Sequence, residues 1–439
     1  MDHYHMSGLG ISIALVVMTG AESSARADCA PQWLAGVPGM NGTVSAMTVL
    51  PDGHALVGGA FTTVGGAPAN YLARFDPSGN TWSALGSEPN GEIRTLALLP
   101  DGDLIVGGFL TAAGGVPANH IARYSPSTNT WSALGAGVEG YFVRALAVLP
   151  NGDVVVGGGF SMVGGMPANN IALYSTAANT WSALGAGTSG GPHNGTVYAL
   201  AVLPGGDVLV GGEFTSADGM PASMIARYSP ASATWSTLGS GTNGWVLALA
   251  VLAGGDVIVG GYFTSAGGES AIHIARYSPA DSTWSPIGAG VSGPGSGVFT
   301  LNLLPVGDVI AGGSFSNAGG VPASNIARLN PANNTWSALG SGTNGWVFQL
   351  TAIPGGDVLV GGGFSTAGGN ASSYFGRWGP AWGDLNGDGF VRLADWSLFV
   401  GCIHGPESAS GAGCGCADAD SDGDVDLQDA AVFQLRFRP

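Results

Sequence analysis

The sequence predicts a mainly β protein, a seven-bladed β-propeller of four-stranded antiparallel blades, and two repeated patterns carry this prediction. The pattern "VGGxF" recurs along the 439 residues at intervals of 49 to 54 residues. Its last position is held by Phe61, Leu110, Phe160, Phe214, Phe263, Phe315 and Phe364. The pattern "WSxLG" keeps the same rhythm and begins at Trp33, Trp82, Trp131, Trp181, Trp235, Trp284 and Trp336. Self-similarity at such a period is typical of repeat folds.

Each repeat predicts four short strands in a fixed order. In the fourth repeat they cover residues 197–204, 207–214, 225–230 and 235–239. These segments are rich in Val, Leu, Tyr and Trp, and Gly and Pro bound them, as expected for strands. A unit this small cannot bury both faces of its sheet, so the units must stack, and four antiparallel strands per unit indicate propeller blades.

The two ends of the repeat array predict how the ring closes. The last repeat stops at Pro380 without its own "WSxLG" segment, whereas the first copy of that segment, at Trp33, has no repeat before it. We therefore expect the strand at Trp33 to complete the seventh blade, which would leave no open sheet edge. The propeller is predicted over residues 28–381.

The residues before the propeller, 1–27, are interpreted as a signal peptide. An apolar run at Leu9–Met18 precedes an Ala-x-Ala pattern at Ala25–Ala27, which indicates cleavage after export. A retained N-terminal anchor is the alternative. That run is too short to span a membrane, and no other segment of the sequence predicts a span. We expect a secreted or cell-surface protein.

Export would allow the four cysteines, Cys29, Cys402, Cys414 and Cys416, to form disulfides. A Cys402–Cys414 or Cys402–Cys416 bridge is favoured, and ring closure makes Cys29 a further partner for a tail cysteine. The pairing stays open. The chain carries 29 acidic and 12 basic residues, a net charge of −17, which argues against binding to nucleic acid or to anionic membranes.

Positions that vary between repeats predict a ligand-binding rim. Two positions at the start of each first strand differ from blade to blade, and their spacing of two places them on one side of the strand. The predicted rim consists of Glu92, Arg94, Arg144, Tyr198, Trp245, Trp346 and Phe348. Aromatic side chains beside a few polar groups suit sugar rings or extended peptides. The alternative is that these side chains only plug the mouth of the channel.

The blades offer no catalytic residue that we can predict. They contain no cysteine and no "GxSxG" motif, no pair of carboxylates stands out, and His54, His120, His193 and His273 lie in separate repeats. An Arg recurs in the third strand at positions 74, 123, 227, 276, 328 and 377, and Leu173 interrupts the series. We interpret these arginines as structural, bonding backbone carbonyls between blades. The protein is predicted not to be an enzyme.

Two calcium loops are predicted in residues 382–439. The first offers oxygen ligands at Asp384, Asn386, Asp388, Phe390 and Asp395, and the second at Asp418, Asp420, Asp422, Asp424, Asp426 and Asp429. Phe390 and Asp424 would contribute their backbone carbonyls. Gly389 and Gly423 occupy the sixth loop positions, where the chain turns sharply. We therefore expect Ca²⁺ as the cofactor.

Two family resemblances follow from these motifs. Residues 31–381, with a double glycine ending the second strand, an aromatic in the third and Trp opening the fourth, resemble bacterial kelch repeats. They are similar to the central domain of galactose oxidase and to fungal cortical cell-polarity markers. The copper chemistry of that oxidase is not implied, because the blades contain no cysteine. The tail resembles a type I dockerin, a small α-helical calcium-binding module.

The dockerin resemblance implies a cohesin-type partner, contacted through Leu393, Ala394, Leu427 and Gln428. A calcium-stiffened anchor or cap for the propeller is the alternative for the tail. The leading hypothesis is a secreted, non-enzymatic propeller that binds a glycan or protein and is attached through the tail. Two alternatives stay open: an accessory or cryptic hydrolase of a polysaccharide-degrading assembly, and a purely structural surface or adhesion protein.

Overall fold

The computed structural model describes residues 31–86, 88–354, 356–379 and 393–403, with 417, 425 and 430. The described residues fall into two compact units, one over 31–379 and one from 393 onward. The first unit is built almost entirely of strands. The calcium-loop residues before 393 and after 403, together with Leu427, Gln428 and residues 1–27, lie outside the described residues.

Within residues 31–379 the described strands form seven sheets with four main strands each, besides several small hairpins. The first strands are β2 (Val44–Val49), β8 (Ile93–Leu98), β14 (Val138–Val148), β20 (Val197–Val202), β26 (Val246–Val251), β33 (Gly297–Leu303) and β39 (Trp346–Ala352). The second strands are β3 (Ala55–Gly59), β9 (Leu104–Gly108), β15 (Val154–Val163), β21 (Val208–Gly212), β27 (Val257–Gly261), β34 (Val309–Ser314) and β40 (Val358–Gly363).

The third strands are β6 (Leu72–Asp76), β12 (Ile121–Ser125), β17 (Ile171–Ser175), β24 (Ile225–Ser229), β30 (Ile274–Ser278), β37 (Ile326–Asn330) and β43 (Phe375–Gly379). The fourth strands are β7 (Thr81–Ala84), β13 (Thr130–Ala133), β18 (Thr180–Ala183), β25 (Thr234–Thr237), β31 (Thr283–Pro286), β38 (Thr335–Ala338) and β1 (Gln32–Trp33). In each sheet the strands lie side by side in the order first, second, third and fourth, and neighbouring strands are antiparallel. β1 pairs with β43, Trp33 opposite Trp378.

Two-residue strands join the second and third strands as small hairpins. They are β4 (Thr63–Val64), β5 (Ala67–Pro68), β10 (Ala112–Ala113), β11 (Val116–Pro117), β16 (Met166–Pro167), β22 (Ser216–Ala217), β23 (Met220–Pro221), β28 (Ser265–Ala266), β29 (Glu269–Ser270), β35 (Asn317–Ala318), β36 (Val321–Pro322), β41 (Thr366–Ala367) and β42 (Asn370–Ala371). β19 (Thr188–Ser189) and β32 (Val291–Ser292) extend two of these hairpins from the preceding repeat.

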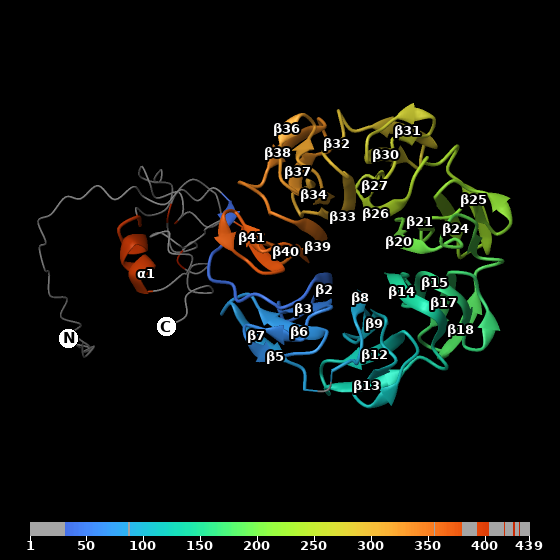
Figure 1. The fold of residues 1–439 in the computed structure, drawn as a ribbon, viewed down its shortest axis with the longest axis horizontal. Coiled ribbons are helices and arrows are strands. Elements are labelled where there is room, and N and C mark those ends of the chain that lie inside the picture. The colour runs from blue at the N-terminus through green and yellow to red at the C-terminus, as the bar shows by residue number, and fades with distance from the viewer. Residues whose placement is uncertain are drawn as a thin grey trace, which may run out of the picture. The chain divides into compact units, whose positions relative to one another are not determined.

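Figure 1 shows the sheets arranged about a common axis, with first strands innermost and fourth strands outermost. The double glycine explains how closely they approach. A Cβ placed on Gly211 would lie 2.5 Å from Cγ1 of Val246, which belongs to the first strand of the next sheet. A Cβ placed on Gly212 would instead meet the backbone carbonyl of Thr196. The first glycine thus admits the neighbouring sheet, and the second admits the adjacent strand.

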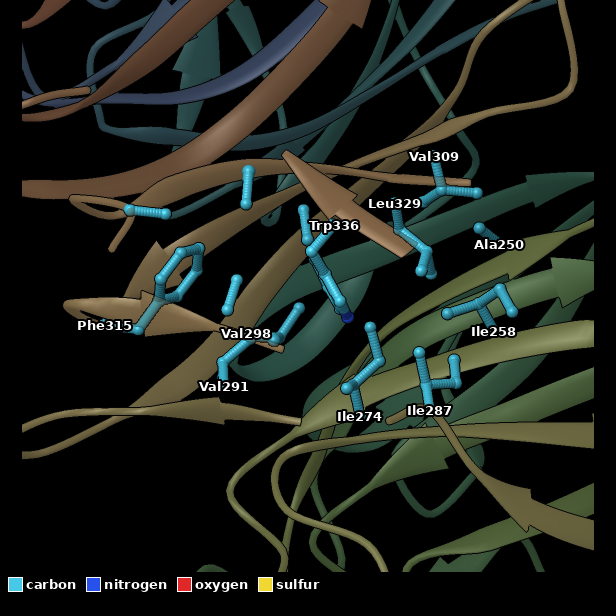
Figure 2. Packing of buried hydrophobic residues seen from close by; sticks show 14 of the residues in the cluster. Ala250, Ile258, Ile274, Ile287, Val291, Val298, Val309, Phe315, Leu329 and Trp336 are labelled. Atoms are coloured by element: carbon cyan, nitrogen blue, oxygen red, sulfur yellow. The ribbon is translucent and has the colours of Figure 1, made fainter. Parts of the chain in front are cut away.

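The core consists of apolar clusters between neighbouring sheets. Figure 2 shows one of them, where Trp336 and Leu329 pack with Ile258, Ile274 and Ile287 of the preceding repeat. All described second strands are buried almost throughout, because a neighbouring sheet covers each face. Burial of apolar surface on this scale is the main stabilising contribution to the fold.

Indole hydrogen bonds tie consecutive sheets together at their outer edges. The Nε1–H of Trp235 donates to the carbonyl of Leu184 at 3.0 Å, and that of Trp284 donates to Leu238 at 2.9 Å. The same bond joins Trp181 to Leu134. The Nε1–H of Trp33 donates to the carbonyl of Leu339 at 2.9 Å, so the N-terminal strand takes part in the same series.

The recurrent third-strand arginines are structural, as expected. Each forms an ion pair with an Asp of the turn between the first and second strands of its own repeat, for example Arg328 with Asp308 at 2.5 Å. The predicted bond to a carbonyl of the next sheet is confirmed for Arg276, which donates to Pro331. It is also confirmed for Arg377, which donates to Pro77.

The second unit contains the helix α1 (Leu393–Val400), so Leu393 and Ala394 lie in its first turn. The ring of Trp396 stacks on that of Phe399 at 5.5 Å, and Phe399 is buried. Cys402 is disulfide-bonded, to a cysteine outside the described residues. In the described part of the chain, no helix has the length and apolar character needed to cross a membrane.

Candidate functional site

The inner strands enclose a cavity of about 260 Å³ along the axis of the propeller. Four residues of the predicted rim line it: Arg94, Arg144, Tyr198 and Phe348. They come from β8, β14, β20 and β39, and each is the residue at which its first strand shifts register against the second strand. Polar side chains of Ser45, Thr95, Thr300 and Gln349 line the cavity as well.

An arc of aromatic rings borders one side of the mouth. Trp245 contacts Tyr198 and Tyr262, with ring centroids 6.2 and 6.0 Å apart. Tyr262 continues to Phe299 at 5.4 Å, and Phe299 contacts Trp346 and Phe348. We call these six residues (Tyr198, Trp245, Tyr262, Phe299, Trp346 and Phe348) the aromatic arc.

Several aromatic side chains at this end are unusually open to solvent. Trp346 is 54 % exposed, Tyr262 39 % and Phe109 40 %, whereas the aromatic rings between the sheets are buried or partly buried. Tyr141 is 79 % exposed and lies where β14 shifts register against β15. Large apolar rings exposed together on a protein surface indicate a contact site for another molecule.

The opposite side of the mouth carries charge. Nε of Arg94 lies 2.9 Å from Oε1 of Glu92, and the Arg94 guanidinium also lies 5.4 Å from the centroid of the Phe109 ring. Ser45 Oγ donates to Glu92 at 3.5 Å. Arg144 occupies the equivalent position of the next first strand and lines the cavity, where burial, followed by the positive charge of Arg94, lowers its pKa to about 10. Arg144 therefore remains protonated near neutral pH.

A buried carboxylate supports the loop beside Trp245. Glu213 is fully buried at the end of the fourth "VGGxF" segment. Its carboxylate accepts a hydrogen bond from Tyr198 Oη at 3.2 Å, lies 2.6 Å from His193 Nδ1, and accepts the backbone N–H of His193 at 3.2 Å. Burial and the nearby charge of Glu213 raise the pKa of Tyr198 to about 12, so its hydroxyl stays a donor.

The structure thus brings the predicted rim residues to one mouth but divides them into two sectors. Glu92, Arg94 and Arg144 form the charged sector, and Tyr198, Trp245, Trp346 and Phe348 belong to the aromatic arc. Sequence reasoning missed Phe109, Glu213 and Tyr262. All three occupy the variable position of "VGGxF", which ends the second strand beside the start of the first and was the signal that could have found them.

Comparison with known families assigns the chain. The model of the Rax2 C-terminal β-propeller domain matches residues 17–143 and 189–302, which together exceed half of the chain. The chain belongs to the Rax2 C-terminal β-propeller domain family. A second match, to a β-propeller domain of unknown function, covers residues 307–333 of this Rax2-family chain. No curated protein matches it.

Two solved structures share the fold of the Rax2-family propeller. They are extracellular domains assigned to a one-component system and to a hybrid two-component system of B. thetaiotaomicron, with TM-scores of 0.52 and 0.53 and 15 % identity. Each alignment covers 79 % of this chain but only 39 % of the other, so this chain spans about two fifths of those domains. Of the predicted rim, Arg144, Trp346 and Phe348 lie outside the Rax2 match.

Proposed function

We propose that this protein is a secreted or surface-attached propeller that binds an extracellular glycan, without catalysis, at the mouth of the axial cavity. In this proposal the seven sheets are the blades of one ring closed by β1. The observation that carries it is the aromatic arc, with its exposed rings beside a polar cavity. Aromatic faces pack against the apolar faces of sugar rings, and nearby polar groups orient the hydroxyls.

An extracellular location is supported by three observations. Cys402 lies in a disulfide, which persists in oxidising compartments. Residues 1–27 have the pattern of a signal peptide. The two solved structures described above are extracellular domains.

Binding is favoured over hydrolysis by the state of the buried carboxylate at the mouth. Both oxygens of Glu213 already accept hydrogen bonds from within the protein, and the group is fully buried. A general acid or base must reach the substrate proton, whereas Glu213 is placed to hold the loop at His193. Cryptic hydrolase activity is the alternative. If the protein released reducing sugar from an oligosaccharide that it binds, the hydrolase alternative would hold and our proposal would be wrong.

The binding test uses the full chain and isothermal calorimetry against cellohexaose, xylohexaose, mannohexaose and hexagalacturonate. We expect at least one to bind, and the Trp245→Ala/Trp346→Ala variant to lose about tenfold or more in affinity. Val306→Ala is the matched control, because Val306 is exposed in a turn between first and second strands, at the other end of the blade. Unchanged affinity in the double tryptophan variant, or binding to none of the four, would overturn the proposal.

We also propose that the tail is a dockerin-like calcium module that attaches the kelch-like propeller to a cohesin-type partner. Its support is the pair of loop patterns at Asp384 and Asp418. Calorimetry of the full chain with Ca²⁺ is expected to give two sites. Asp388→Ala and Asp422→Ala should each remove one of them. Absence of calcium binding by the unchanged chain would refute the module.

A further inference from the structure

The placement of arginine sets one residue of the cavity apart. The described residues contain eight arginines, and six of these occupy the recurrent third-strand position, each with an Asp partner. The other two, Arg94 and Arg144, both line the axial cavity. The chain has a net charge of −17, and within its described part the arginines outside the recurrent position are both in this cavity.

The two cavity arginines differ in their partners. Arg94 is neutralised by Glu92 at 2.9 Å. Arg144 forms neither an ion pair nor a hydrogen bond with any side chain or backbone group in the part of the chain that the structure describes. The side chain of Arg144 is partly buried, and it borders the open space of the cavity. An arginine without a partner inside a protein is costly, because part of its hydration is lost and no anion replaces it.

The surroundings of Arg144 limit the kind of anion that would relieve this cost. Glu92 is close enough to interact electrostatically with the guanidinium, which disfavours a doubly charged group such as phosphate. A carboxylate carries one charge and matches the planar fork of arginine. The cavity of about 260 Å³ is small, and the hydroxyl and amide groups of Ser45, Thr95, Thr300 and Gln349 can bond neutral oxygens around the carboxylate.

We propose that Arg144 is the anion-recognition residue of the mouth, and that it receives the carboxylate of a uronic acid whose ring, or whose neighbour in the chain, stacks on the aromatic arc. This proposal rests on the glycan-binding function proposed above and names its ligand class, an acidic oligosaccharide. Tyr198 joins the two parts, since it lines the cavity and contacts Trp245.

The test compares hexagalacturonate with its fully methyl-esterified form, which keeps the rings but lacks the charges. Calorimetry of the full chain should show the acidic form binding about tenfold or more tightly, as expected for a charge-assisted hydrogen bond. Arg144→Met should abolish this preference while still binding the ester. Arg74→Met is the matched control, because Arg74 is a paired, partly exposed arginine of the third-strand series, and it should keep the preference.

Thermal unfolding separates recognition from a structural role. If Arg144 supported the fold, Arg144→Met would lower the melting temperature, whereas loss of an unpaired charge should leave it unchanged or raise it. Equal affinity for the two forms in the unchanged protein would overturn the anion site and leave glycan binding intact. If the protein bound a neutral hexaose but neither form of hexagalacturonate, the anion site would likewise be refuted and glycan binding would stand. Binding of none of these, or of an acidic aromatic peptide instead, would refute the glycan function itself.

Discussion

At the scale of single residues, the position before each third strand is unusual in its backbone. Seven residues there have φ between 63° and 66°, the left-handed region that side chains with a Cβ rarely adopt. They are Tyr71, His120, Asn170, Met224, His273, Asn325 and Tyr374. Hydrogen bonds maintain this conformation, for example from the backbone N–H of His120 to the carbonyl of Leu110 at 2.8 Å. Tyr71, Met224 and Tyr374 are the least favourable residue types for it, whereas Asn170 and Asn325 tolerate it well.

The two histidines of this series predict a pH dependence of stability. Burial lowers the pKa of His120 and of His273, and Nδ1 of each is buried without a hydrogen-bond partner in the described structure. Below about pH 6.5 the unfolded chain binds protons at these residues while the folded chain does not. The free energy of unfolding is therefore expected to fall as the pH drops from about 7 to about 5, through the ordinary histidine pKa.

The chain provides its own control for this prediction. In His120→Asn/His273→Asn both positions would carry the residue found at Asn170 and Asn325, whose side chains bond neighbouring backbone groups. Melting temperatures measured at both pH values should differ less in the variant than in the unchanged protein. If the melting temperature fell equally in the variant and in the unchanged protein, groups other than these two histidines would govern the acid sensitivity.

A second residue-scale prediction concerns the double glycine. Gly211→Ala should lower the free energy of unfolding by about 1–3 kcal/mol, because the new methyl group would overlap Val246 of the next sheet. Gly205→Ala is the control, since nothing lies within 4 Å of a Cβ placed there. Denaturant unfolding of the two variants measures the difference. Similar stabilities would mean that the sheets separate more easily than the structure indicates.

At the scale of elements, the tryptophan that opens each fourth strand joins its sheet to the one before. The strength of this link can be measured because Trp336 departs from the series: its buried Nε1–H has no partner in the described structure. Trp235→Phe removes a hydrogen bond to Leu184 and should cost about 1 kcal/mol beyond the loss of packing, whereas Trp336→Phe removes no bond. Chemical denaturation midpoints should therefore fall further for Trp235→Phe, and the reverse order would contradict the role of the bond.

The sequence predicts the elements better than it predicts the site. Strand order follows from the repeat, and for the fourth repeat the expected 235–239 appears as β25 (Thr234–Thr237). The extension of β14 and β15 to eleven and ten residues was not predictable, because it depends on shifts of register near Gly140. The variable position of the repeat marks Glu213, but its contact with His193 was not predictable, because His193 lies on an inserted loop that only the folded chain brings to it.

At the scale of the whole propeller, the contacts between the first and last repeats test ring closure. A Cβ placed on Gly361, in β40, would clash with Val44 of β2, as Gly211 does with Val246. If the ring is closed in solution, Gly361→Ala should destabilise the protein about as much as Gly211→Ala, by about 1–3 kcal/mol. Unfolding of the two variants side by side decides this. If Gly361→Ala left the free energy of unfolding unchanged while Gly211→Ala lowered it, the first and last sheets would be apart in solution.

The pairing of Gln32 with Gly379 also sets a time order for biosynthesis. β1 is among the first described residues to leave the ribosome, yet its partner β43 is made almost 350 residues later. At about 5–20 residues per second, that delay lasts roughly 20–70 s. During this interval the inner sheets can fold, while the segment at Trp33 must wait with its backbone groups unpaired. Among the described strands, β1 therefore waits longest for its partner in the nascent chain.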